Sequence, residues 1–326
     1  LSERNISITF GMQLDANTQA EPLRNKVNQL SITAWSDYAE HYQSLSHAWF
    51  KQAKENLSQL SIKENTMGLT NLKVLAAVWW MKNQFSSMFK SDKNCGIFLP
   101  ASTAGVMANL ACLSLAKTVV NLNFSNDIKT LSSCIKKADI NTIISSRQFI
   151  KKLKLSDDDI KTLGGKWIFL EDLRKTKSKI EIIIRAALVK ILPLKILQRL
   201  MLSYVDTNDL AAIMFSSGSE SAPKGICLSH KNLLSNVKQL GSILALEKDD
   251  VMLSSLPMFH AFGFTVTTML PLIQGIPLVC SPDPTNAKII AETIARHQVT
   301  LMCATATLLG IYIRNKNIPA IYLKSL

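Results

Sequence analysis

A loop rich in serine and glycine that follows a buried strand constrains this chain more than any other feature. The apolar run 211–215 predicts the strand. Residues 216–225 then read Ser-Ser-Gly-Ser-Glu-Ser-Ala-Pro-Lys-Gly. Such a loop offers backbone amides, several hydroxyl donors and the ammonium of Lys224 to one small volume. This combination is typical of a polyphosphate site, although a surface loop that happens to hold a lysine remains the simplest alternative.

The loop differs from the Walker phosphate loop at two positions. Gly218 and Lys224 have the Walker separation, but Pro223 stands where the second glycine would be. Gly225 replaces the Ser/Thr that would hold magnesium. After the loop, Ile226–Leu228 predicts a short strand and Ser229 predicts the N-cap of a helix.

A second motif lies in a long stretch without charge. Residues 251–282 contain no Asp, Glu, Lys or Arg, and prolines and a glycine divide them into strand, helix and strand. Within them, residues 256–263 read Leu-Pro-Met-Phe-His-Ala-Phe-Gly. A lone histidine such as His260 on an apolar background is usually a core residue. Residue type alone therefore leaves its role open.

Together the two motifs resemble the adenylate-forming enzymes: acyl-CoA and acyl-carrier-protein synthetases, peptide-synthetase adenylation domains and luciferases. The resemblance covers about Thr66 to Leu326. Ser221 departs from the family's glycine, and Thr305-Ala306-Thr307 departs from its Thr-Pro-Thr. The resemblance implies an α/β fold. The chain would be the N-terminal domain of such an enzyme, with mixed sheets flanked by helices, truncated before the C-terminal lid domain.

The resemblance also implies site residues and substrates. The expected ATP-binding residues are Ser216, Ser217, Gly218, Ser219, Lys224 and Gly225. The expected acyl-pocket residues are Phe259, His260 and Gly263, with His260 and Lys224 also catalytic. ATP is expected with Mg²⁺, whose main ligand would lie beyond Leu326, and no metal ligand is expected within the chain.

The reaction implied is attack of a fatty-acid carboxylate on ATP, followed by transfer of the acyl group to a thiol. Acyl carrier protein is the favoured acceptor, and CoA is the other. A long-chain acyl-CoA ligase remains one alternative. A non-catalytic, membrane-associated scaffold with a degenerate phosphate loop is another. Residues 1–326 alone are expected to be inactive.

Three short segments look closest to the bifunctional 2-acylglycerophosphoethanolamine acyltransferase/acyl-carrier-protein synthetases: residues 121–124, 145–149 and 169–173. We therefore expect residues 1–62 to be the tail of an upstream acyltransferase-like domain plus linker. Residues 63–326 would be a partial AMP-binding domain. The expected role is phospholipid acyl metabolism, in a cytoplasmic protein peripheral to the inner face of a bacterial inner membrane.

The formal net charge is +13, and much of the basic excess lies between Arg174 and Arg199. No nucleic-acid module is recognisable, so no nucleic-acid partner is expected. Residues 178–202 are densely apolar, but no uncharged run there exceeds four residues, so they cannot span a bilayer. Two alternatives remain: an amphipathic helix that caps the sheet and breaks near Pro193, or one that lies on an anionic membrane with its lysines extended outward.

Residues 95–116 carry no charge and are long enough to span a bilayer. Pro100, Gly105 and Asn109 favour strand, turn and helix in a soluble core instead. The six cysteines form no C-x-x-C pair and are expected to be reduced core residues. Further strands are expected at residues 6–10, 95–100, 119–122, 142–145, 167–170, 251–256, 276–280 and 300–304.

Overall fold

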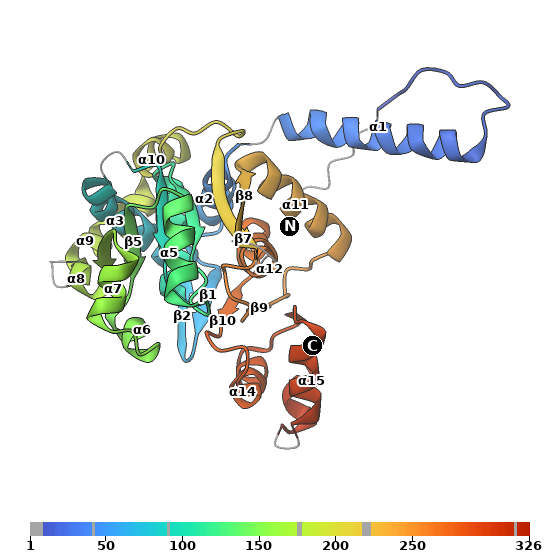
Figure 1. Cartoon of the computed structure of the whole chain (residues 1–326). Helices are drawn as coiled ribbons and strands as arrows, with labels where there is room; N and C mark the ends of the chain where they lie inside the picture. The colour runs from blue at the N-terminus through green and yellow to red at the C-terminus, as the bar shows by residue number, and fades with distance from the viewer. Residues whose placement is uncertain (1–8, 41–42, 90–91, 175–177, 217–222, 316–317) are drawn as a thin grey trace.

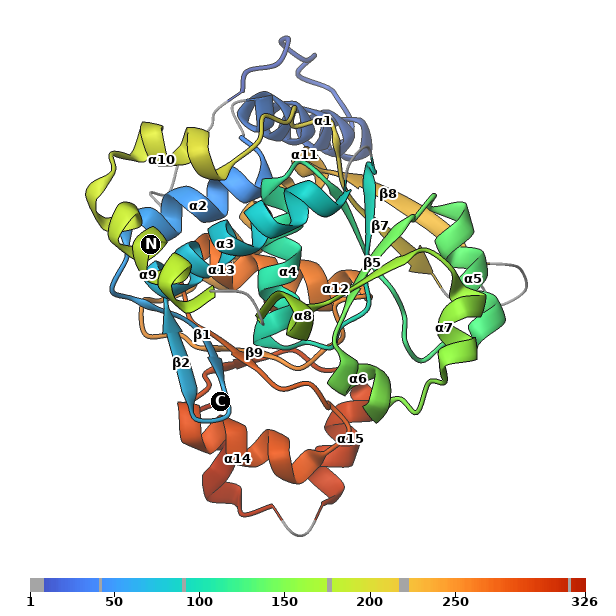
Figure 2. The same cartoon turned by 90° about the vertical axis from the view of Figure 1, so that its left-hand side faces the viewer.

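The computed structural model describes residues 9–40, 43–89, 92–174, 178–216, 223–315 and 318–326. It has an α/β fold with two mixed sheets and helices on their faces (Figures 1 and 2). The fold class expected from the sequence is confirmed.

The larger sheet has six strands in the order β6-β5-β3-β4-β7-β8. All neighbouring pairs are parallel except β7 and β8, which form an antiparallel hairpin. Every residue of β4 and β5 is buried, as expected for strands covered on both faces. The six strands are β3 Asn94–Ile97, β4 Thr118–Asn121, β5 Thr142–Ser145, β6 Lys166–Phe169, β7 Leu210–Ser216 and β8 Lys224–Ser229.

The smaller sheet has five strands in the order β11-β9-β10-β1-β2. They are β1 Leu60–Glu64, β2 Met67–Thr70, β9 Met252–Ser254, β10 Leu278–Cys280 and β11 Leu301–Met302. The β1–β2 hairpin was not predicted, because both strands are short and charged residues interrupt β1. Asn65 in its turn has φ 52°, a conformation that asparagine adopts more readily than most residues.

The helices complete the layers. They are α1 Ala20–Glu40, α2 Leu45–Glu55, α3 Asn71–Phe89, α4 Thr103–Ser114, α5 Ile128–Lys137, α6 Arg147–Lys152, α7 Asp157–Leu163, α8 Leu170–Arg174, α9 Ser178–Ile191, α10 Leu194–Met201, α11 His230–Leu244, α12 Ala261–Phe264, the π-helix η1 Thr265–Met269, α13 Leu270–Gln274, α14 Ala287–His297, α15 Ala306–Arg314 and the 3₁₀ helix η2 Ala320–Leu323. Residues 95–116 form β3, a turn and α4, as predicted. No helix among the described residues is long and apolar enough to cross a membrane.

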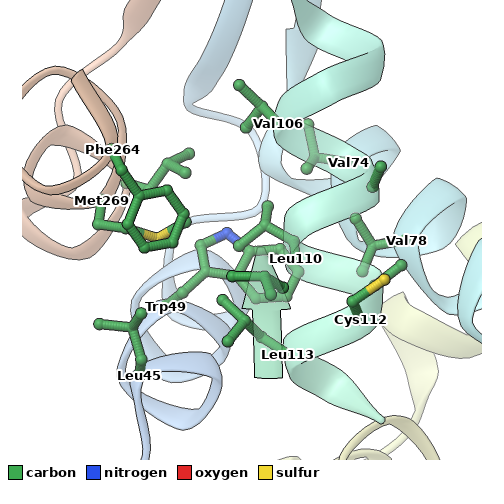
Figure 3. Packing of buried hydrophobic residues seen from close by; sticks show 14 of the residues in the cluster. Leu45, Trp49, Val74, Val78, Val106, Leu110, Cys112, Leu113, Phe264 and Met269 are labelled. Carbon is green, nitrogen blue, oxygen red and sulfur yellow. The ribbon is translucent and has the colours of Figure 1, made fainter. Parts of the chain in front are cut away.

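The main core lies between the two sheets. Figure 3 shows Trp49 of α2 beside Leu110 of α4, with Phe264 and Met269 from the uncharged stretch on its other side. Side chains of both sheets line the same core. A second core lies under α5 and α7 on the other face of the six-stranded sheet, and a third lies under α14 on the other face of the smaller sheet. Removing a buried ring such as that of Trp49 typically costs 3–5 kcal/mol, roughly.

This packing bears on the expected division at residue 62. Leu45, Trp49 and Phe50 of α2 are fully buried in the main core, and β1 pairs with β10. Residues 45–62 therefore belong to the same folded unit as the rest, and the division at residue 62 would cut through β1. The acyltransferase origin of the first residues stays a prediction. Of the strand expected at residues 6–10, residues 6–8 lie outside the described part, and residues 9 and 10 are not in a strand.

Candidate functional site

The predicted phosphate loop joins the two strands of the β7–β8 hairpin. Ser216, the last residue of β7, pairs with Lys224, the first residue of β8. Gly225 pairs with Phe215, and both Lys224 and Gly225 are exposed. Ser217, Gly218, Ser219 and Ser221 lie outside the described residues. The hairpin therefore presents Ser216 and Lys224 at the two ends of the loop.

A second lysine reaches this loop from α5. Lys137 Nζ donates a hydrogen bond of 3.0 Å to the carbonyl oxygen of Pro223, next to Lys224. Lys137 is exposed and ends its helix. Lys137 was not predicted from the sequence, because no local pattern connects α5 to a loop so much later in the chain. Two ammonium groups can thus approach a polyphosphate at this loop.

The helix after β8 begins as predicted. The Ser229 hydroxyl accepts from the Asn232 N–H, and the Asn232 side chain accepts from the Ser229 N–H. His230, which sequence analysis did not single out, is buried, and its Nδ1 accepts a 3.1 Å hydrogen bond from the N–H of Leu45. Burial lowers the pKa of His230 to about 4, although Asp209 opposes the shift. This bond fixes the start of α11 to the start of α2.

The second motif is attached to the end of β4. Asn109 of α4 and Asn121 of β4 exchange two side-chain hydrogen bonds of 3.0 Å, and both are buried. The same Asn109 Nδ2 lies 3.7 Å from the sulfur of Met258. A paired polar network in a core specifies its arrangement, because a mispaired amide would be costly. Met258 therefore directs Phe259 towards the carboxyl end of β4.

Phe259 joins a group of rings that we call the aromatic cluster: Phe98, Phe124, Phe149, Trp167, Phe169 and Phe259. The Phe259 and Phe124 ring centroids are 4.9 Å apart, and those of Phe124 and Phe149 are 5.0 Å apart, both edge to face. Phe98 lies within 6.3 Å of Phe124, 5.9 Å of Phe149 and 5.8 Å of Trp167. Trp167 stacks on Phe169 at 6.2 Å. These distances are typical of favourable aromatic pairs.

His260 stands at the border of the aromatic cluster. Its ring centroid is 4.5 Å from that of Phe259, and the residue is exposed. Desolvation by the surrounding protein lowers the pKa of His260, which favours the neutral imidazole near pH 7. A neutral imidazole can donate or accept a hydrogen bond without adding charge. His260 lies beside the aromatic cluster, and its role at an acyl pocket stays a prediction.

Gly263 contributes through its backbone. A Cβ at this position would lie 2.1 Å from the carbonyl oxygen of Pro257, so no other residue fits without a shift of the chain. The Gly263 carbonyl accepts hydrogen bonds of 2.9 Å from the hydroxyls of Thr267 and Thr268 in the π-helix. The structure thus gives Gly263, predicted as a pocket residue, a packing role that shapes the turn carrying His260.

The described ends of the phosphate loop and Phe124 of the aromatic cluster lie at the same edge of the six-stranded sheet. β4 and β7 are parallel neighbours, with Val119 opposite Ala212. Ser216 ends β7, and Phe124 follows β4 by three residues. The carboxyl ends of parallel strands meet at one edge, which is where ligands bind in open α/β sheets. The arrangement can therefore place a polyphosphate and an apolar chain next to each other.

No group of three or more His, Cys, Asp or Glu that could hold a metal ion occurs in the described parts of the chain. The Mg²⁺ ligand expected beyond Leu326 stays a prediction.

The model of the family described as AMP-binding enzyme matches residues 83–325. The chain belongs to the AMP-binding enzyme family. The matched residues include the phosphate loop, the aromatic cluster and the second motif. The bifunctional acyltransferase fusion, a narrower expectation, remains a prediction.

Curated relatives of this AMP-binding enzyme include several acyl ligases. The chain is 38% identical over 97 residues to "Probable 4-coumarate--CoA ligase 3" of Dictyostelium discoideum, which is 29% of the chain and 17% of that protein. It is 33% identical over 99 residues to "Medium-chain-fatty-acid--[acyl-carrier-protein] ligase JamA" of Moorena producens, 29% of the chain and 17% of that protein. A longer match, 26% identical over 242 residues, covers 67% of the chain and 38% of "Medium-chain acyl-CoA ligase ACSF2, mitochondrial" of Pongo abelii. These matches span less than two fifths of each relative's length.

Solved structures share the fold. The O-succinylbenzoate Coenzyme A Synthetase (MenE) from Bacillus subtilis, in complex with AMP, superposes with a TM-score of 0.69 at 18% identity. The match covers 84% of this AMP-binding enzyme and 65% of that chain. The N-terminal domain of FACL13 from Mycobacterium tuberculosis gives a TM-score of 0.68 at 16% identity, over 85% of this chain and 66% of that one. At these identities the likeness shows the fold of an adenylate-forming N-terminal domain.

Proposed function

We propose that the protein activates a fatty acid with ATP and transfers the acyl group to a thiol, with acyl carrier protein as the favoured acceptor. The observation that carries this proposal is the position of the aromatic cluster, with His260 at its border, at the same sheet edge as the phosphate loop. The fatty-acid ligase names among the relatives support it. A role in phospholipid acyl metabolism belongs to the same proposal.

In the first step, a carboxylate oxygen of the fatty acid attacks the α-phosphorus of ATP. The bond from that phosphorus to the oxygen bridging the α- and β-phosphates breaks, and pyrophosphate leaves. Lys224 and Lys137 offset the charge that develops on the phosphates. Ser216, Ser217, Gly218, Ser219 and Gly225 supply amide and hydroxyl donors. Mg²⁺ bound with ATP would supply further charge neutralisation.

In the second step, the thiol sulfur attacks the acyl carbonyl, AMP leaves with the electron pair, and the thiol proton passes to solvent. The acyl chain would lie against the partly exposed rings of the aromatic cluster, which are Phe124, Trp167 and Phe169. Neutral His260 can orient the carboxylate without attracting it as a fixed ion pair would. The contribution of the protein is therefore mainly positioning and charge stabilisation.

The test is fatty-acid-dependent exchange of labelled pyrophosphate into ATP by the full-length protein. Exchange that requires a fatty acid supports adenylation, and its absence with every chain length tried would overturn the proposal. Adding either CoA or phosphopantetheinylated acyl carrier protein to the charged enzyme then identifies the acceptor.

A second candidate is an acyl-CoA ligase, because a match over 242 residues is to a medium-chain acyl-CoA ligase. In that case CoA, and not the carrier protein, would release AMP in the acceptor assay. The non-enzymatic alternative is a membrane-associated scaffold whose degenerate loop, with Ser221 in place of glycine, no longer acts on ATP. Full-length protein that binds neither ATP nor fatty acid would favour the scaffold.

A further inference from the structure

The paired helices α9 and α10 have two different apolar faces. They lie between β6 and β7 in the sequence and beside α3 and α2 at one edge of the molecule (Figure 2). The chain breaks between them at Leu192–Pro193, as Pro193 predicts. The sequence alone leaves open whether this segment caps the sheet or lies on a membrane. The structure separates these two roles onto opposite faces.

The inner face packs on the main core. Val189, Leu197 and Met201 are fully buried. Arg185 lies over the ring of Trp79 at 5.8 Å, and its guanidinium forms a 3.3 Å ion pair with Glu181. The inner face thus packs on α3 and α2 and covers the main core through these helices.

The outer face carries a second apolar surface, which we call the outer stripe: Ile180, Ile183, Ile184, Ile191, Ile196 and Leu200. Each of these side chains is between 47% and 77% exposed. At 100° per residue, Ile180, Ile184 and Ile191 project within about 40° of one another around α9. Ile196 and Leu200 lie one turn apart on α10. A helix that only capped the sheet would not need isoleucines on this side.

Cations border the outer stripe. Lys179, Lys190, Lys195 and Arg199 are exposed on the same two helices. Glu181 is the single acid in the α9–α10 sequence, and it pairs with Arg185. The surface thus combines a row of isoleucines with uncompensated positive charge.

We propose that the outer stripe and its four cations dock on an anionic lipid surface, with both helices lying in the plane of the membrane. This inference is independent of the proposed ligase activity. A lipid surface accepts apolar side chains between its head groups and attracts lysine and arginine through its phosphates. A second copy of this face would bring like charges together, which disfavours self-association there. The 14 residues of α9 extend for about 21 Å, too short to cross a bilayer.

The experiment is sedimentation of residues 1–326 with phosphatidylcholine vesicles, with and without phosphatidylserine. We expect binding to the anionic vesicles alone, and we expect salt to weaken it. Each cation near such a surface contributes about a fivefold factor in partitioning. The triple variant Lys190→Glu, Lys195→Glu, Arg199→Glu should therefore bind on the order of 100-fold more weakly.

Matched control variants test whether binding depends on this face or only on the net charge and the exposed apolar area of the whole protein. Lys129→Glu, Lys136→Glu, Lys151→Glu reverses three exposed lysines on α5 and α6, away from α9 (Figure 2), and should bind as the parent does. Ile191 and Ile243 are both 77% exposed. Ile191→Gln should weaken binding by about tenfold, and Ile243→Gln, on α11, should not.

Three results would overturn the proposal. The first is no sedimentation of the parent with anionic vesicles. The second is equal loss of binding in the α9–α10 variants and in their matched controls. The third is concentration-dependent dimerisation that Ile191→Gln abolishes while vesicle binding is unchanged, which would assign the outer stripe to a second copy. Thermal unfolding of each variant confirms that it is folded before the vesicle assay.

Discussion

The ring of Phe124 meets the ring of Phe259 edge to face, with centroids 4.9 Å apart and an interplanar angle of 86°. Phe124 follows β4 of the six-stranded sheet, whereas Phe259 follows β9 of the smaller sheet. Their contact therefore joins the two sheets at the edge that carries the phosphate loop. Because an edge-to-face pair depends on both ring positions, replacing either ring should affect both the stability of the fold and the binding of the acyl chain.

We expect Phe124→Leu to lower the free energy of unfolding by about 1–2 kcal/mol, because leucine fills much of the volume but loses the ring contacts with Phe98, Phe149 and Phe259. Urea unfolding measures this loss. The same variant of the full-length protein should show a raised KM for the fatty acid.

Phe262→Leu is the matched control, because Phe262 belongs to the second motif, like the cluster residue Phe259, but is 53% exposed. Its effect on stability should stay within about 0.5 kcal/mol. Equal effects of the two substitutions would show that the aromatic cluster has no special role.

Much of the aromatic cluster was visible in the sequence as separate pieces. Phe124, Phe149 and Phe169 occur in the three short segments that look like one branch of the family, and Phe259 occurs in the second motif. The strands before them were predictable, because runs such as 142–145 are apolar and uncharged. Their convergence was not, since it depends on the order of strands in the sheet.

The residues that sequence analysis missed act over long separations. Lys137 and His230 each contact a segment far away in the chain, through Pro223 and Leu45 respectively. Neither belongs to a periodic pattern or a motif, so residue type and spacing carry no signal for them. The β1–β2 hairpin was missed for a different reason: its pairing with β10 stabilises strands that are too short to be recognised alone.

We expect Gly263→Ala to distort the second motif. The added methyl group would lie 2.1 Å from the Pro257 carbonyl oxygen. Because this oxygen belongs to the backbone, it cannot move aside as the end of a flexible side chain could. Stability should fall by about 2 kcal/mol or more, and adenylation by the full-length protein should fall with it. Thermal unfolding and pyrophosphate exchange measure the two effects.

Gly310→Ala is its control, because Gly310 lies within α15 and a Cβ there meets nothing within 4 Å. Alanine favours a helix over glycine by about 1 kcal/mol, so this variant should be as stable as the parent or more so. If Gly263→Ala were equally neutral, the close approach to Pro257 would have no consequence.

We expect Lys224→Ala to slow adenylation by tenfold or more, a loss of about 1.4 kcal/mol in transition-state stabilisation. Stability should be unchanged, because Lys224 is exposed. Lys137→Ala should have a smaller effect in the same direction, since its ammonium already bonds the Pro223 carbonyl. Pyrophosphate exchange by the full-length protein measures both.

Lys129→Ala, also on α5 and exposed, is the control for general charge loss and should leave the rate unchanged. Rates that fall equally in all three lysine variants would point to the overall charge of the protein. An unchanged rate for Lys224→Ala would mean that Lys224 does not act on ATP and would favour an ordinary surface loop.

The buried imidazole of His230 should make stability depend on pH. Its pKa is lowered from 6.5 to about 4 in the folded chain, so as the pH falls the unfolded chain binds the proton first. The contribution of His230 is fully present above pH 6.5 and is lost between pH 6.5 and about 4, to the extent of about 3 kcal/mol. In His230→Asn, the side-chain oxygen can accept the Leu45 N–H without titrating, so its stability should fall less over this range. Urea unfolding at several pH values measures the difference.

Three other histidines also have lowered pKa values: His47, His260 and His297. Because they are present in both proteins, the free energy of unfolding of His230→Asn should still fall somewhat as the pH falls. His297→Asn, at the end of α14, is the matched control and should flatten the curve less. Parallel curves for the parent and His230→Asn would contradict the prediction, because they would mean that titration of His230 does not contribute to the pH dependence of stability.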